Sequence, residues 1–146
     1  MARLKGKGGR LSVFKGREAK LNRAIFHILA LKGPQTIYDI HKEVKTRRRL
    51  RHVRYATVNK RVRALTESGY IKKIGVKKTK AGFEASIYEL TARAYLALLL
   101  DSINLEDLLM HIDEATALTL LGAIARIITG TFAIRSSLSI VEQFFN

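Results

Sequence analysis

Residues 57–71 read Thr-Val-Asn-Lys-Arg-Val-Arg-Ala-Leu-Thr-Glu-Ser-Gly-Tyr-Ile, and this stretch decides the fold. Val58, Val62 and Leu65 recur at helical spacing, which predicts a helix over residues 55–68 with one apolar face. Gly69 is the residue type that ends such a helix, and the apolar period changes to two after it. The sequence therefore predicts a helix that leads directly into a strand.

Two more helices are predicted upstream of this stretch. From Glu18 the apolar residues follow helical spacing until Gly33 and Pro34 end the helix. Thr36 then opens Thr-Ile-Tyr-Asp, a pattern typical of a helix cap, and the second helix ends near Lys45. Three short helices in tandem, of which the last is basic, are typical of a helix-turn-helix.

A β-hairpin is predicted downstream. Residues 70–76 and 83–90 are typical of strands, and the loop 77–82 between them contains a glycine and three lysines. Tyr70, Phe83 and Tyr88 fall in these strands, so packing is their expected role. The fold class predicted is mainly α with a small β-hairpin wing, a winged helix-turn-helix, followed by a C-terminal all-α dimerisation segment.

The stretch 57–71, followed after a basic hairpin by Ile87-Tyr-Glu-Leu-Thr91, resembles the recognition-helix and wing signature of MarR-like and PadR-like winged-helix transcriptional regulators. The resemblance covers roughly residues 20–100 and is at the level of the superfamily. It implies a transcription factor that binds duplex DNA sequence-specifically. It also implies a homodimer, because the C-terminal helices and the first helix commonly form the subunit interface in these families.

The charge of the chain is unevenly distributed. The 146 residues include 27 lysines and arginines and 12 acidic residues, a net charge of +15. Residues 1–93 hold 25 of the basic and six of the acidic side chains, whereas residues 94–146 hold two and six. We therefore expect three parts: a basic flexible arm (1–17), a DNA-binding domain (18–93) and an apolar helical dimerisation segment (94–146).

The C-terminal segment is predicted to be helical throughout. A helix that follows Thr91 is apolar nearly all round, so it should be buried on several sides. Asn104 is a predicted cap, a helix over about 113–129 should end at Gly130, and Ser136 or Ser137 should open a last helix. We expect Arg126 to pair with an acidic residue of a second copy. The expected interface residues are Leu96, Leu99, Leu100, Leu108, Leu120, Leu121, Ile124, Ile128 and Phe144.

The predicted DNA contacts fall into three groups. Side chains early on the helix over 55–68 are expected to contact base edges in the major groove: Tyr55, Thr57, Asn59, Lys60 and Arg63. Phosphate or wing contacts are expected from Arg47, Arg48, Arg49, Arg51, Arg54, Arg61, Lys72, Lys73, Lys77, Lys78 and Lys80. The arm contributes Arg3, Lys5, Lys7 and Arg10.

Catalysis is not predicted. The chain has no cysteine, its four histidines lack the spacing of metal ligands, and no phosphate-loop or nucleophile motif is present. We therefore expect a basic protein that is not an enzyme and needs no cofactor. Without an apolar run of signal-peptide length at its N-terminus, it should be cytoplasmic and associated with the nucleoid.

Other interpretations of the sequence remain open. A module with a net charge of +19 over residues 1–93 would also suit an RNA-binding or ribosome-associated winged-helix protein, or a nonspecific chromatin-like DNA-binding protein. Residues 115–134 contain a single charge, Arg126, and offer a membrane anchor as a further alternative. Nothing in the sequence marks a site for a small-molecule effector.

Overall fold

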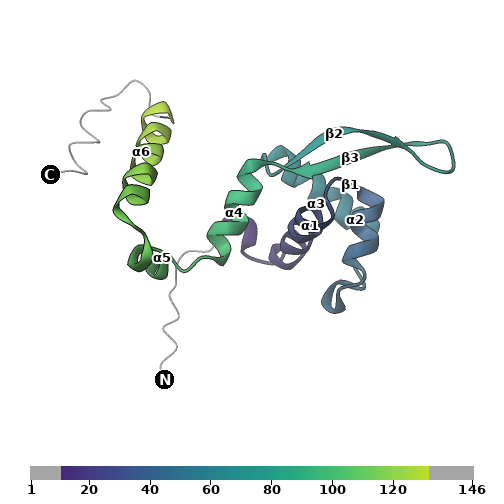
Figure 1. The fold of residues 1–146 in the computed structure, drawn as a ribbon. Helices are drawn as coiled ribbons and strands as arrows, with labels where there is room; N and C mark the ends of the chain where they lie inside the picture. The colour runs from purple at the N-terminus through teal and green to yellow at the C-terminus, as the bar shows by residue number, and fades with distance from the viewer. Residues whose placement is uncertain (1–10, 132–146) are drawn as a thin grey trace. The chain divides into compact units, whose positions relative to one another are not determined.

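The computed structural model describes residues 11–131 (Figure 1), and the chain divides into two units between Ser102 and Ile103. Several predicted features lie outside the described residues. These are the last helix, expected from Ser136 or Ser137, and the contact residues Arg3, Lys5, Lys7, Arg10 and Phe144.

The first unit is a winged helix-turn-helix domain. Its elements in chain order are η1 (Ser12–Phe14), α1 (Ala19–Lys32), β1 (Gln35–Thr36), α2 (Ile37–Val44), η2 (Arg48–Leu50), α3 (Tyr55–Glu67), β2 (Ile71–Lys78), β3 (Glu84–Leu90) and α4 (Ala92–Ser102). The three predicted helices and the predicted hairpin are all present.

The local signals act as the sequence predicts. The hydroxyl of Thr36 accepts a hydrogen bond from the Asp39 amide at 3.2 Å and so caps α2. Gly69 has a φ of +79°, which residues with a Cβ adopt at a cost, and the chain leaves α3 there. The chain then enters β2 two residues later.

The sheet has three antiparallel strands in the order β1-β3-β2, where two were predicted. The additional strand, β1, pairs Gln35 with Tyr88 and Thr36 with Ile87. It was missed because two residues are too few to show an alternating pattern. Between β2 and β3 the register shifts between Lys73 and Gly75, as in a β-bulge.

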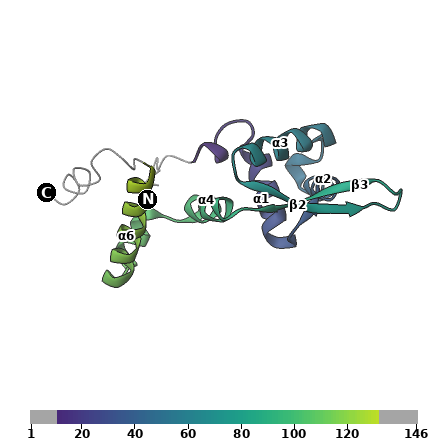
Figure 2. The same cartoon turned by 90° about the horizontal axis from the view of Figure 1, so that it is seen from above.

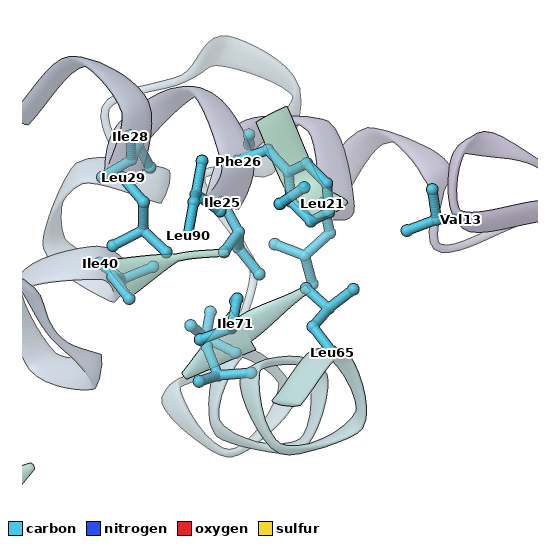
Figure 3. Close-up of a cluster of buried hydrophobic side chains, with 14 of the residues drawn as sticks. Val13, Leu21, Ile25, Phe26, Ile28, Leu29, Ile40, Leu65, Ile71 and Leu90 are labelled. Carbon is cyan, nitrogen blue, oxygen red and sulfur yellow. The ribbon is translucent and has the colours of Figure 1, made fainter. Parts of the chain in front are cut away.

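The core lies where the three helices meet the base of the hairpin (Figure 3). Ile25 and Phe26 of α1 are completely buried, as are Val58 and Val62 of α3. Because the apolar faces of both helices are covered, the rotation of α3 about its axis is fixed, and so is the face that it turns to solvent.

The helix α4 belongs to the first unit by its packing. Ala94 and Ala97 lie in the same core, and Asp101 accepts hydrogen bonds from Nε and Nη2 of Arg23 on α1, at 3.0 and 3.2 Å. The first unit therefore extends to Ser102, whereas the sequence predicts a boundary after Arg93. The predicted start of the domain at residue 18 is also too late, because Val13 and Phe14 are buried in its core.

The second unit contains α5 (Leu105–His111) and α6 (Glu114–Thr131). Asn104 caps α5 as predicted, and Asp113 caps α6 through the amide and hydroxyl of Thr116. The expectation that Gly130 ends this helix is wrong, because α6 continues through it. A glycine inside a helix costs about 1 kcal/mol relative to alanine, which lowers stability without ending the helix.

Candidate nucleic-acid interface

Four of the five side chains predicted to contact bases lie on the open face of α3. Tyr55, Thr57, Lys60 and Arg63 are exposed, while Val58, Val62 and Leu65 face the core. Within residues 11–131, neither Lys60 nor Arg63 has an acidic partner. Their charges are therefore available to a ligand.

Asn59, the fifth of these side chains, is half-buried. Its Oδ1 is buried and has no hydrogen-bond partner in the described part of the chain. A buried polar atom without a partner costs about 1–3 kcal/mol, so an outward rotation toward a ligand would be favoured.

Arg61 lies apart from the open face of α3. Its Nε donates a hydrogen bond to Oδ1 of Asn22 at 3.2 Å and lies 3.9 Å from the Glu18 carboxylate. The side-chain amide nitrogen of Asn22, Nδ2, in turn donates to the Val13 carbonyl at 2.8 Å. Arg61 thus connects α3 with the start of α1 through its Nε. The phosphate contact that the sequence predicts for it stays a prediction.

The start of α3 is held by α2. Nε2 of His41 lies 2.9 Å from the carbonyl oxygen of Val53, in the loop just before α3. The His41 ring also meets the ring of Tyr55 edge to face, with centroids 5.7 Å apart. These contacts fix the position at which the first turn of α3 emerges from the domain.

The loop between α2 and α3 carries five arginines. Arg48, Arg49, Arg51 and Arg54 are exposed and Arg47 is half-buried. None of the five makes a side-chain hydrogen bond or ion pair with residues 11–131. The loop therefore presents a concentrated positive charge beside the helix.

The helix α1 also contributes to the basic surface formed by the arginine loop, which the sequence did not predict. Lys20 and His27 of α1 line a shallow hollow of about 390 Å³ together with Arg47, Arg48 and Arg49. The spacing of Lys20, Arg23 and His27 places them on one side of α1, a signal that the apolar pattern of the same helix obscured.

The hairpin β2–β3 forms a wing that projects beyond the helices (Figure 2). Lys72 is paired with Glu89 at 3.2 Å. The other predicted wing residues are exposed and make no ion pair with any described residue: Lys73, Lys77, Lys78 and Lys80. The wing thus adds four lysines without an ion pair to the basic residues of α3 and its preceding loop, with Glu84 opposite Lys78 in the sheet.

Phe83 does not have the packing role expected of it. Tyr70 and Tyr88 pack against the core, but Phe83 follows the turn of the wing and 73% of it is exposed. The strand pattern placed Phe83 correctly beside β3, but it did not show that the hairpin extends past the helices at this point.

The outer side of α4 is apolar and open. Tyr95, Leu96, Leu99 and Leu100 are all more than two-fifths exposed, against the expectation of burial on several sides. The reason is that α4 packs on the domain mainly through Ala94, Ala97 and the half-buried Leu98, and within residues 11–131 these four side chains stay largely uncovered.

In the second unit no residue of the described range 103–130 is buried. Among the predicted interface residues, Leu120, Leu121 and Ile124 are exposed, and Leu108 and Ile128 are half-buried. Nε of Arg126 donates to the Gly122 carbonyl of its own helix at 3.4 Å. The expected pairing of Arg126 concerns a second copy and stays a prediction.

Neither a membrane-spanning helix nor a metal site is found within residues 11–131. No helix in this range has the length and hydropathy that crossing a bilayer requires. No group of three or more histidine, aspartate or glutamate side chains in the same range is placed to hold a metal ion.

No protein-family model matches the chain, and no curated protein matches it in sequence. Among solved structures it is similar to diamide-treated YodB from B. subtilis, with 18% identity and a TM-score of 0.46 over 62% of this chain and 76% of that one. It is also similar to TA0346 from Thermoplasma acidophilum, named as a proposed transcriptional regulator, with 17% identity and a TM-score of 0.44 over 66% and 100% of the two chains. Neither similarity is strong enough to indicate what this chain binds.

Proposed function

We propose that this protein is a dimeric transcriptional regulator that binds duplex DNA sequence-specifically and belongs to the MarR-like and PadR-like winged-helix proteins. The observation that carries the proposal is the open face of α3, where Thr57, Lys60 and Arg63 are exposed next to a wing and a loop of unpaired cations. The resemblance of residues 57–71 to the recognition helix of these regulators supports the same assignment.

The chemistry of this face suits the major groove. The groove is about 12 Å wide and admits an α-helix, whose exposed side chains then meet base edges. Lys60 and Arg63 carry donors that suit the O6 and N7 acceptors of guanine, and the methyl group of Thr57 suits that of thymine. Asn59 would pair with adenine after its side chain turns outward.

The remaining basic residues are assigned to phosphates. Arginines 47–54 and the wing lysines surround α3, and positive side chains at such positions orient a protein on the duplex without reading its sequence. We assign Arg3, Lys5, Lys7 and Arg10 the same role, whereas residues 11–17 belong to the folded domain, with Val13 and Phe14 buried in its core. This gives the chain an arm, a winged-helix domain that includes α4, and a helical segment after it.

Dimerisation is proposed through the C-terminal helices. Monomeric soluble proteins rarely expose contiguous apolar patches larger than a few hundred Å². Here α4 exposes four large apolar side chains, and the described helices of the second unit bury no residue. Residues 94–146 also carry only two basic side chains, which makes a second copy a better partner for them than a polyanion.

Selection of bound sequences from random duplexes, with the mass of the protein measured alongside, tests the proposal. A twofold-symmetric motif with half-sites separated by about one helical turn, or a multiple of it, is expected for a dimer. Competition with structured RNA at fixed salt completes the test. Recovery of no motif, or stronger binding of the RNA, would overturn sequence-specific DNA recognition.

A further inference from the structure

We propose that Phe83 is a wedge that enters the minor groove and inserts between base pairs, so that the protein bends the DNA to which it binds. This inference rests on the proposed binding of duplex DNA. It assigns a separate role to the wing, which would otherwise contribute only charge.

The first observation is the exposure of a large apolar side chain. Phe83 is 73% exposed, and its ring contacts no other aromatic ring among residues 11–131. Full burial of a phenylalanine side chain stabilises by roughly 1.5–3 kcal/mol, and the folded chain leaves most of this unrealised. A ligand that covers the ring would therefore gain it.

The second observation is that the wing tip is preorganised. The Thr79 amide donates to the Phe83 carbonyl at 2.7 Å, and the Phe83 amide donates to the Thr79 hydroxyl at 3.2 Å. The Gly82 amide donates to the Thr79 carbonyl at 2.9 Å, with Gly82 at a φ of +83°. The backbone of Phe83 is thus fixed by the turn, which lowers the entropy lost when the ring is inserted.

The third observation is the charge around the ring. Lys77, Lys78 and Lys80 carry the positive charge of the tip, and Glu84 is the acidic residue nearest in sequence. Residues 77–84 keep a net charge of +2, because Glu84 is next to Phe83 and opposite Lys78 in the sheet. An apolar ring on a tip of net positive charge is complementary to a surface that places stacked bases between two rows of phosphates. The minor groove of duplex DNA is such a surface.

The reach of the wing is sufficient. The Lys73–Tyr88 pair lies at the edge of the core, and the strands stay paired as far as Lys78 and Glu84. Five residues of strand span roughly 17 Å, at about 3.3 Å for each residue. The minor groove is about 7.5 Å deep, which is less than the length of this paired segment.

Insertion has a recognisable physical consequence. Side chains such as phenylalanine that enter between base pairs unstack them, at a cost of a few kcal/mol per step, and kink the duplex by about 20–90°. Burial of the ring and the neighbouring lysine–phosphate contacts offset this cost. Bending and unstacking are therefore the signals to measure, in addition to affinity.

The test uses the full chain with a duplex labelled at both ends for energy transfer, and a second duplex with a fluorescent adenine analogue at successive positions. We expect the unchanged protein to shorten the end-to-end distance and to raise the fluorescence at one base step. Phe83→Ala should abolish both signals and leave the salt dependence of binding unchanged. Phe83→Leu, which keeps an apolar wedge, should retain most of the bend.

Two further variants and a measurement of thermal unfolding make the test specific. Leu31→Ala removes a side chain that is 82% exposed on α1, away from the wing, and should leave the bend unchanged. Lys78→Ala should lower the salt dependence and keep the bend. Phe83→Ala should unfold at the same temperature as the unchanged protein, because the ring supports nothing else.

The outcomes separate the two proposals. Equal bending by the unchanged protein and Phe83→Ala overturns the wedge and leaves the proposed function intact. The wedge is also overturned, and the proposed function left intact, if Phe83→Ala loses affinity for single-stranded DNA but bends the duplex normally. The ring would then stack on the bases of single strands. Failure of the unchanged protein to bind duplex DNA overturns both proposals.

Discussion

Lys60 and Lys78 carry the same charge but should contribute to DNA binding in different ways. Lys60 lies on the open face of α3 and Lys78 lies at the end of β2, in the wing. Both are exposed and have no acidic partner in the part of the chain that the structure describes. We predict that Lys60→Ala changes the base preference and that Lys78→Ala weakens binding to all sequences alike.

The magnitudes follow from the two kinds of contact. A direct base contact discriminates by about 1–3 kcal/mol, so Lys60→Ala should reduce the preference at one base position by roughly 5- to 150-fold. A phosphate contact contributes about −0.9 to the slope of log K against log salt. When the salt rises from 50 to 200 mM, the fold loss of affinity for Lys78→Ala should therefore be about 3.5 times smaller than the fold loss for the unchanged protein.

The assay is fluorescence anisotropy on the selected duplex and on its single-base variants, at several salt concentrations. Lys32→Ala is the matched control, because it also removes one positive charge but Lys32 is paired with Glu43 at 2.8 Å. Equal losses on every duplex with Lys60→Ala would refute the major-groove assignment of α3. A changed base preference with Lys78→Ala would refute the assignment of the wing lysine to phosphate.

Three further predictions concern the fold and the interface. Gly69→Ala should destabilise by about 1–2 kcal/mol from its positive φ and by little more, because the Cβ that would lie 2.8 Å from Nη1 of Arg93 meets only the end of an exposed, flexible side chain that can move aside. Gly82→Ala has the same φ strain in open space, so a much lower denaturation midpoint for Gly69→Ala than for Gly82→Ala would contradict this. Leu96→Asp with Leu99→Asp should reduce the sedimentation mass from dimer to monomer, while Val76→Asp, at an exposed position of β2 in the wing, does not. A dimeric double variant would exclude α4 from the interface. The Thr116 hydroxyl and amide hold the pKa of Asp113 below its usual value of 3.8. The stabilisation of α6 by this carboxylate is therefore complete above pH 3.8 and is lost as the pH falls through the lower pKa of the folded chain. Far-UV dichroism should show this loss of helix in acid and Asp113→Ala should remove it, whereas superimposable pH titration curves for the two proteins would argue against the cap.

The parts of the fold that the sequence predicted are those encoded by neighbouring residues. Gly69 ends α3 and Thr36 caps α2 through contacts within a few positions, and the apolar period of each helix is visible without knowledge of its partners. By contrast, the two residues of β1 form a strand only because β3 lies beside them. No local pattern contains that information.

The same distinction applies to the candidate site. Helical spacing placed Lys60 and Arg63 on the open face correctly, since the buried face of α3 is continuous. It could not show that Arg61 reaches Asn22, a contact between α3 and a residue 39 positions away. The hollow that joins Lys20 to the arginine loop also depends on how α1 packs, so it became visible only in three dimensions.

A dimer recognises two half-sites at a fixed separation only if its interface is rigidly connected to both recognition helices. The helix α4 meets this requirement. Its small residues Ala94 and Ala97 are buried in the core that also holds α3, and its exposed side is apolar. The contact of Asp101 with Nε and Nη2 of Arg23 holds α4 against α1. Asp101→Ala should therefore cost about 1 kcal/mol of stability and also relax the preference for half-site spacing. Binding to duplexes with half-sites one or two base pairs closer or farther apart measures this. An unchanged spacing preference would mean that α4 does not determine the distance between the recognition helices.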